Sequence, residues 1–127
     1  MNDKSTEPMT TVEDMNSLVV VQPESTISRT ILKSEGTRLV LFGFAKGQVL
    51  TEHTAAVPVL LQALSGELVI SADGRSDILK PGGVIHLGTR VPHAVEALTD
   101  SVMLLTMLDG RKTIQELTLQ KKAPENS

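Results

Sequence analysis

The chain has 127 residues, a formal net charge of -3 and no cysteine, which excludes disulfides, thiolate metal sites and cysteine nucleophiles. Its length predicts one compact domain, and its proportions of hydrophobic residues (40%) and charged residues (21%) are typical of a folded protein. Lys and Arg are scattered, no apolar run is long enough to cross a membrane, and no secretory signal opens the sequence. We therefore expect a cytoplasmic protein that binds neither nucleic acid nor membrane.

Short segments rich in Val, Ile, Leu and Thr predict strands in a domain over residues 12–109. Residues 1–11 are polar and are expected to form a flexible tail, because they offer little apolar surface to bury. The predicted strands are 18–22, 26–32, 37–45, 59–64, 67–72, 76–80, 83–88, 93–98 and 101–108. Residues 110–127 are expected to be an extension, either a strand or a short helix followed by frayed residues.

Turn residues separate these strands at regular intervals. The pair Asp73 and Gly74 lies between two predicted strands and favours the positive backbone φ that a tight hairpin needs. Other glycine-containing turns are predicted at residues 34–36, 45–47, 65–66 and 81–83. Short strands at this spacing predict an all-β sandwich or barrel.

Two of the segments carry a spacing of glycine and histidine that indicates a family. The first, GQVLTEHTAAVPVLLQALSG, occupies residues 47–66 and contains His53. The second, GGVIHLGTRVPHAVEA, occupies residues 82–97 and contains His93. In both segments the chain resembles the cupins, and especially the small single-domain RmlC-like cupins, over about residues 36–108. This resemblance implies a jelly-roll antiparallel β-barrel and a homodimer.

The resemblance also implies where a metal ion would bind. In metal-binding cupins, three side chains of the first motif and one histidine of the second converge on one ion. The matching positions here are His53, Ala55, Val59 and His93. Alanine and valine cannot coordinate a metal, so half of the ligand set is present. Two histidines would hold one divalent ion such as Fe, Mn, Ni or Zn only weakly, with water or substrate completing the shell.

The second motif departs from the cupin pattern before its histidine. Gly83, Gly88, Arg90 and Ala97 stand where an acid, a proline, a glycine and an asparagine are usual. The turn before His93 is therefore expected to have an altered geometry. We expect Arg90 to be a solvated loop residue, and pairing with an anionic ligand at the barrel mouth is the alternative.

Strand alternation predicts which side chains face the barrel interior. The expected pocket lining is His53, Ala55, Val59, Leu61, Ala63, His93, Met103, Leu105 and Met107. Glu52 and Glu96 are expected to face away from the two histidines. His86 is a further candidate metal ligand if the register turns it inward, and otherwise a half-buried packing residue.

Three hypotheses for the function follow. The first is a binding or sensory module that holds a small molecule in an apolar pocket, with His53 and His93 as its polar anchors. The second is a metal-dependent enzyme of dioxygenase, isomerase or decarboxylase type, in which the two histidines hold the ion. The third is a structural or partner-binding barrel in which neither histidine contacts a ligand.

Overall fold

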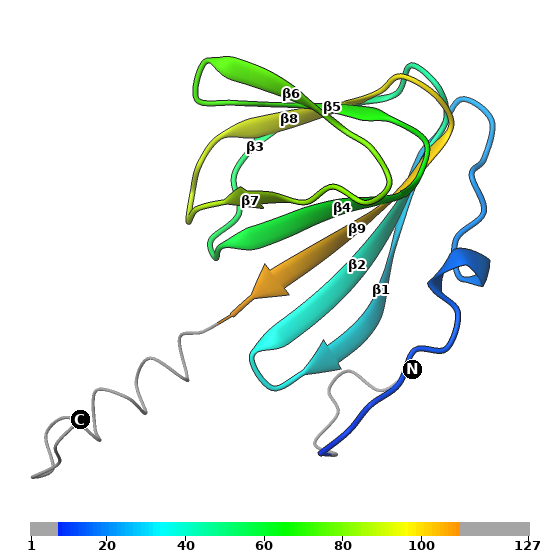
Figure 1. Cartoon of the computed structure of the whole chain (residues 1–127), viewed down its shortest axis with the longest axis vertical. Helices are drawn as coiled ribbons and strands as arrows, with labels where there is room; N and C mark the ends of the chain where they lie inside the picture. The colour runs from blue at the N-terminus through cyan, green and yellow to red at the C-terminus, as the bar shows by residue number, and fades with distance from the viewer. Residues whose placement is uncertain (1–7, 110–127) are drawn as a thin grey trace, which may run out of the picture.

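The computed structural model describes residues 8–109, which form two antiparallel β-sheets that face each other (Figure 1). The larger sheet has the order β1-β2-β9-β4-β7, with the strands Thr26–Ser34, Thr37–Phe44, Ser101–Leu108, Val59–Ser65 and Ile85–Leu87. The smaller sheet has the order β3-β8-β5-β6, with the strands Val49–His53, His93–Ala97, Leu68–Ala72 and Arg75–Leu79. This arrangement is a jelly roll, and it confirms the predicted all-β class.

The space between the sheets is filled by apolar side chains that alternate along the strands. In β4, Val59, Leu61 and Ala63 are buried, whereas Gln62 between them is exposed. The same period of two places alternate residues of β5 and β8 in the core, whereas β9 is buried on both faces over its first four residues. The main core cluster consists of Phe44, Val59, Leu61, Ala63, Leu68, Ile70, Leu79, Leu87, Val95, Ala97 and Met103.

The predicted hairpin at Asp73 and Gly74 joins β5 to β6. The two residues have φ values of 51° and 74°, and Ala72 pairs with Arg75 directly beneath the turn. Aspartate and glycine tolerate the left-handed conformation that a two-residue hairpin turn requires. The turn therefore sets the register of β5 and β6.

The predicted strand at residues 18–22 is wrong. A short 3-10 helix, Met15–Ser17, precedes this segment, and the segment joins neither sheet. Instead, Val19 is buried in a second apolar cluster with Ile31 and Leu41 on the outer face of the larger sheet. Figure 1 shows the segment running beside β1. An apolar segment that packs on a sheet has the same composition as a strand that hydrogen-bonds within the sheet. Composition alone therefore could not distinguish a covering segment from a strand.

The contribution of this covering segment can be tested with two adjacent valines. We expect Val19→Ala to lower the free energy of unfolding by about 2 kcal/mol, because Val19 is 6% exposed and its methyl groups would leave a gap. Val20→Ala is the matched control and should change it by less than about 0.5 kcal/mol, because Val20 is 67% exposed. Urea denaturation measures both, and equal effects would contradict the packing described here.

The strand Val49–His53 was not among the predicted strands, although the first motif includes it. Only two of its five side chains are aliphatic, and most of the strand is exposed. The extension at 110–127 and residues 1–7 of the predicted tail lie outside the described residues. Within residues 8–109, no helix has the length and apolar character needed to span a bilayer.

Candidate functional site

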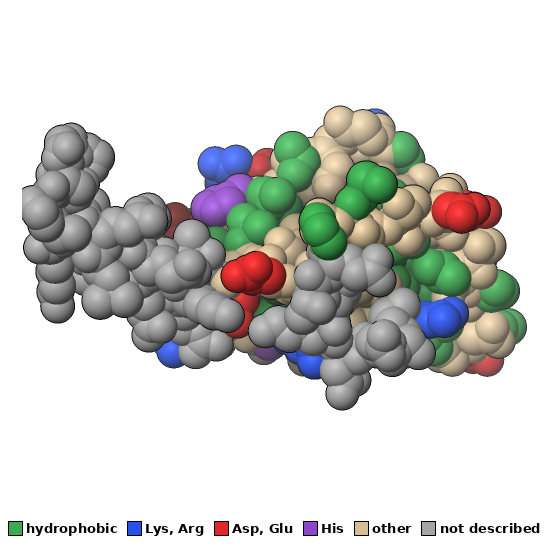
Figure 2. Space-filling model, turned by 90° about the horizontal axis from the view of Figure 1, so that it is seen from below, with side chains coloured by type: hydrophobic (Ala, Val, Ile, Leu, Met, Phe, Trp, Pro, Cys, Tyr) green, Lys and Arg blue, Asp and Glu red, His purple; other side chains and the backbone are tan. Residues whose placement is uncertain are grey.

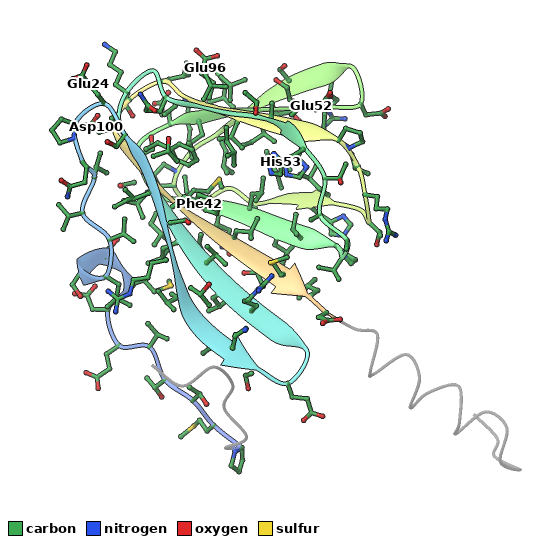
Figure 3. The ribbon with its side chains drawn as sticks, turned by 180° about the vertical axis from the view of Figure 1, so that it is seen from behind. Glu24, Phe42, Glu52, His53, Glu96 and Asp100 are labelled. Atoms are coloured by element: carbon green, nitrogen blue, oxygen red, sulfur yellow. The ribbon has the colours of Figure 1, made fainter. Side chains whose placement is uncertain are left out.

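Two histidines face each other across neighbouring strands of the smaller sheet. His53 ends β3 and His93 begins β8, and the two residues are direct partners in the antiparallel ladder. Their ring centroids lie 4.3 Å apart with an angle of 58° between the planes. His93 is 3% exposed, whereas His53 is exposed. The pair therefore has one ring within the barrel and one at its mouth, and Figure 3 shows His53 pointing into the space between the sheets.

Both imidazoles are oriented by the backbone in the same way. Nδ1 of His53 lies 2.7 Å from the carbonyl oxygen of Thr51, and Nδ1 of His93 lies 2.9 Å from that of Val91. A carbonyl oxygen can only accept a hydrogen bond, so each Nδ1 carries the proton and donates. In the neutral form of this tautomer Nε2 carries the lone pair, and neither Nε2 has a protein partner among the hydrogen bonds of the described residues. The pair can accept two hydrogen bonds from one ligand, or offer two nitrogen ligands to a metal ion.

The other two positions of the family's ligand set add no donor. Val59 is 1% exposed and packed in the core, and Ala55 is half-buried against the same cluster. Among residues 8–109, no group of three or more His, Asp or Glu side chains lies close enough to hold a metal ion. The histidine pair therefore supplies two nitrogen ligands of the four that the family's metal site uses.

The nearby acids and the third histidine do not join the pair. Glu52 and Glu96 are exposed, and Figure 3 shows Glu96 projecting outward from the smaller sheet. His86 pairs with Leu60 between β7 and β4, so it lies on the face opposite to the buried Val59. The structure therefore does not bring His86 together with His53 and His93.

The predicted pocket residues divide by depth. The deep ones form a packed floor, because Val59, Leu61, Ala63 and Met103 are each at most 4% exposed. The shallow ones, Ala55, Leu105 and Met107, are half-buried at the margin of the core. The predicted pocket residues therefore comprise a fully packed part and a partly open margin.

Arg38, which is not among the predicted pocket residues, lies on the same inner face. It is the ladder partner of Met107, and its guanidinium donates to the Met107 sulfur from Nε at 3.3 Å and from Nη2 at 3.1 Å. A thioether is a weak acceptor, so the cation has little compensation from it. Alternation along TRLVLFGF could have placed Arg38 inward, since Phe44 of that strand is a core residue.

A cavity of about 540 Å³ is lined by residues of β6 and β7, which are edge strands of the two sheets, and by residues of β5 and of the β7–β8 loop. Its lining is Ile70, Ala72, Asp73, Arg75, Asp77, Ile85, His86, Leu87, Gly88, Arg90, Val91 and Pro92. Neither His53 nor His93 lines it. Ala72 and Val91 nevertheless connect the two features, because Ala72 is the ladder partner of His93 and Val91 accepts its Nδ1 hydrogen bond.

The β6 wall of the cavity holds an ion pair. The Arg75 guanidinium donates to Asp77 Oδ2 from Nη2 at 2.7 Å and from Nε at 3.2 Å. The hydrogen bond with Asp77 and the charge of that carboxylate raise the pKa of Arg75. This is the one ion pair between described residues, and both side chains are at least half exposed, so it contributes little to stability.

Charged groups are otherwise dispersed. On the face of the molecule shown in Figure 2, the visible Lys and Arg side chains lie apart from one another among uncharged and apolar groups. This face therefore shows no cluster of cations of the kind that holds a phosphate backbone.

Comparison with solved structures relates this geometry to known proteins. No protein-family model and no curated protein matches the sequence. A cupin superfamily protein from Desulfitobacterium hafniense is 25% identical, with a TM-score of 0.71, and the match covers 82% of this chain and 95% of that one. An RmlC-like cupin protein from Desulfovibrio desulfuricans is 25% identical, with a TM-score of 0.70 and coverages of 80% and 97%. A Cupin 2 conserved barrel domain protein from Leptotrichia buccalis is 30% identical, with a TM-score of 0.69 over 74% of this chain and 46% of that one.

Proposed function

We propose that this chain, whose fold is that of the cupin superfamily, binds a small organic molecule at the His53 and His93 pair without a resident metal ion. The observation that carries this proposal is the matched orientation of the two rings. Each Nδ1 is held by a backbone carbonyl, and each Nε2 is left as an acceptor. Two neighbouring acceptors on rings whose centroids lie 4.3 Å apart, beside an apolar core, suit a ligand with hydroxyl or amide donors on an apolar body.

The positions of His53 and His93 suit both the entry of a ligand from solvent and its recognition by hydrogen bonds. His93 is buried as a residue beside the core, but no fully buried side-chain nitrogen or oxygen of the described residues lacks a hydrogen-bond partner, so its Nε2 stays open to water or a ligand. His53 is exposed and can meet a ligand that arrives from solvent. Arg38 and Met107 occupy the same inner face on β2 and β9, so the mouth also carries a cation and an adaptable apolar side chain.

The specific observation that favours an enzyme instead is the availability of two Nε2 atoms for a metal ion. A metal bound by this pair would supply Lewis-acid polarisation of a bound oxygen. The donor set argues against a resident ion, because Ala55 and Val59 occupy the positions of the missing ligands. We therefore favour the binding module.

The proposal is tested by screening metabolites against the protein in buffer that contains a chelator. A ligand present at 100 times its dissociation constant should stabilise the fold by about 2.7 kcal/mol, and it should raise the melting temperature accordingly. We expect His53→Ala to abolish this shift, since His53 is exposed and its loss leaves the core intact.

The matched control is His86→Ala, which removes the third histidine of the chain from the opposite face of the larger sheet. This variant should keep the shift of the wild type. A ligand that stabilises His53→Ala as much as the wild type would contradict the proposal. So would a screen in which every stabilising ligand requires added metal.

A further inference from the structure

We propose that the cavity between β6 and β7 is a second binding site, for a small organic carboxylate with an aliphatic body, and that Arg90 holds the carboxylate. This site is distinct from the histidine pair, which does not line the cavity. The inference therefore stands independently of the function proposed above.

The inner part of the cavity is apolar. Ile70 and Ala72 contribute from β5, and Ile85 and Leu87 contribute from β7. These residues belong to the core cluster or pack against it, so they present fixed aliphatic surface. A volume of about 540 Å³ has room for a compact aliphatic chain together with water.

Arg90 lines the cavity from the loop between β7 and β8, and its backbone is in a strained conformation. Its φ is 60°, in the left-handed region that glycine enters freely and that other residues enter at a cost in backbone strain. The turn is fixed there, because the Arg90 N–H donates to the Ala55 carbonyl at 2.8 Å and the Val91 N–H donates to the Gly88 carbonyl at 3.3 Å. The chain therefore carries a guanidinium at a position whose backbone conformation suits glycine.

The charges around the cavity leave Arg90 as the cation available to a ligand. Arg75 is paired with Asp77, whereas no carboxylate of the described residues forms an ion pair with the exposed Arg90. Asp73 is the remaining acid, at the tip of the opposite hairpin, and His86 lies on the rim. A carboxylate should therefore bind against the turn that holds Arg90, away from Asp73, with two parallel hydrogen bonds to the guanidinium.

The probe is 4-methylpentanoate, with 4-methylpentan-1-ol as its uncharged counterpart. Binding is followed through the methyl resonances of Ile70 and Ile85 in ¹H–¹³C spectra at constant ionic strength. We expect saturable shifts with the acid and at least about tenfold weaker binding of the alcohol. Equal affinity for the two probes, or no saturable shift with the acid, would overturn the proposal.

Variants separate ligand contact from folding. Arg90→Gly should fold at least as stably as the wild type, because it relieves the backbone strain, and should bind the acid at least about tenfold more weakly. Arg90→Lys should bind at an intermediate level, since it keeps the charge and loses the planar fork. Asp73→Asn should bind equally or more tightly, because asparagine tolerates the same turn.

The control for the independence of the two sites is His53→Ala, which should bind 4-methylpentanoate as the wild type does. Unchanged affinity in Arg90→Gly would overturn the role of Arg90. Loss of binding in His53→Ala would show that the acid binds at the histidine pair and would overturn the second site. If no metabolite stabilises the protein but 4-methylpentanoate binds as expected, the proposal for the histidine pair fails and the proposal for the cavity stands.

Discussion

Replacing Gly66 with alanine is expected to lower the free energy of unfolding by about 3 kcal/mol or more, which corresponds to a fall in melting temperature of roughly 10 °C or more. Gly66 has a φ of 77° in the turn between β4 and β5. An added methyl group would overlap the backbone oxygen of Asp100 and the Ser101 hydroxyl, and it would lie 2.8 Å from Ser101 Cα. Most of these atoms are backbone, so they cannot move aside cheaply.

The surrounding hydrogen bonds make this contact difficult to relax. Glu67 follows the glycine, and its N–H donates to Thr99 Oγ1 at 3.1 Å, while its carbonyl accepts from the Leu98 N–H at 2.9 Å. Ser101, which is fully buried, donates to the same carbonyl at 3.3 Å. The close approach of the two loops thus requires the absence of a side chain at residue 66.

Gly74→Ala is the matched control for the steric part of this effect. Gly74 has a similar φ of 74°, yet an added methyl group would meet nothing within 4 Å. We expect a loss of about 1 kcal/mol from backbone strain alone. Chemical denaturation of both variants gives the comparison. Equal losses would mean that strain rather than the contact with Asp100 and Ser101 explains the requirement at Gly66.

The second large effect is expected from Ala55→His, which adds a third imidazole at the position where the first motif of metal-binding cupins carries one. After loading with Zn²⁺ and removal of unbound ion, this variant should retain about one ion per chain, because three histidines and a water make a competent site. The wild type should retain far less. Ala55 is half-buried at the margin of the core, so the larger side chain can reach solvent.

The control for this gain of metal is Ala56→His, which adds an imidazole at the adjacent and exposed position. It should not raise the metal content above that of the wild type. Adding His93→Ala to Ala55→His should abolish the gain. Retention of the ion in that double variant would show that the metal binds elsewhere, and it would contradict the depleted site described here.

Much of the fold could be predicted because alternation in the strands reports burial directly. The segment 59–64 has a polar residue at one outward position, and the structure places Gln62 outside and Leu61 inside. The hairpin at Asp73 was predictable because few residue pairs adopt two successive left-handed conformations. Segment 18–22 was mispredicted because an apolar run that packs on a sheet resembles one that joins it.

The site was predictable only in part. The motifs identified His53 and His93 as partners, and the ladder between β3 and β8 confirms that they are neighbours. The orientation of their rings depends on carbonyl contacts that no spacing encodes. The cavity depends on two sheet edges, near residues 70–77 and 85–92, whose approach is a property of the packed sheets. The local sequence carries little information about how closely the edges of two different sheets approach each other.

The most direct test of the central claim is the metal content of the wild-type protein, purified without a tag or chelator and measured by elemental analysis before and after loading with Mn, Fe, Ni and Zn. The His53→Ala/His93→Ala variant is measured beside it, once both proteins are shown to be folded. We predict well below one ion of any metal per chain in both proteins. About one ion per chain in the wild type, lost in the double variant, would contradict the account and establish the pair as a metal centre.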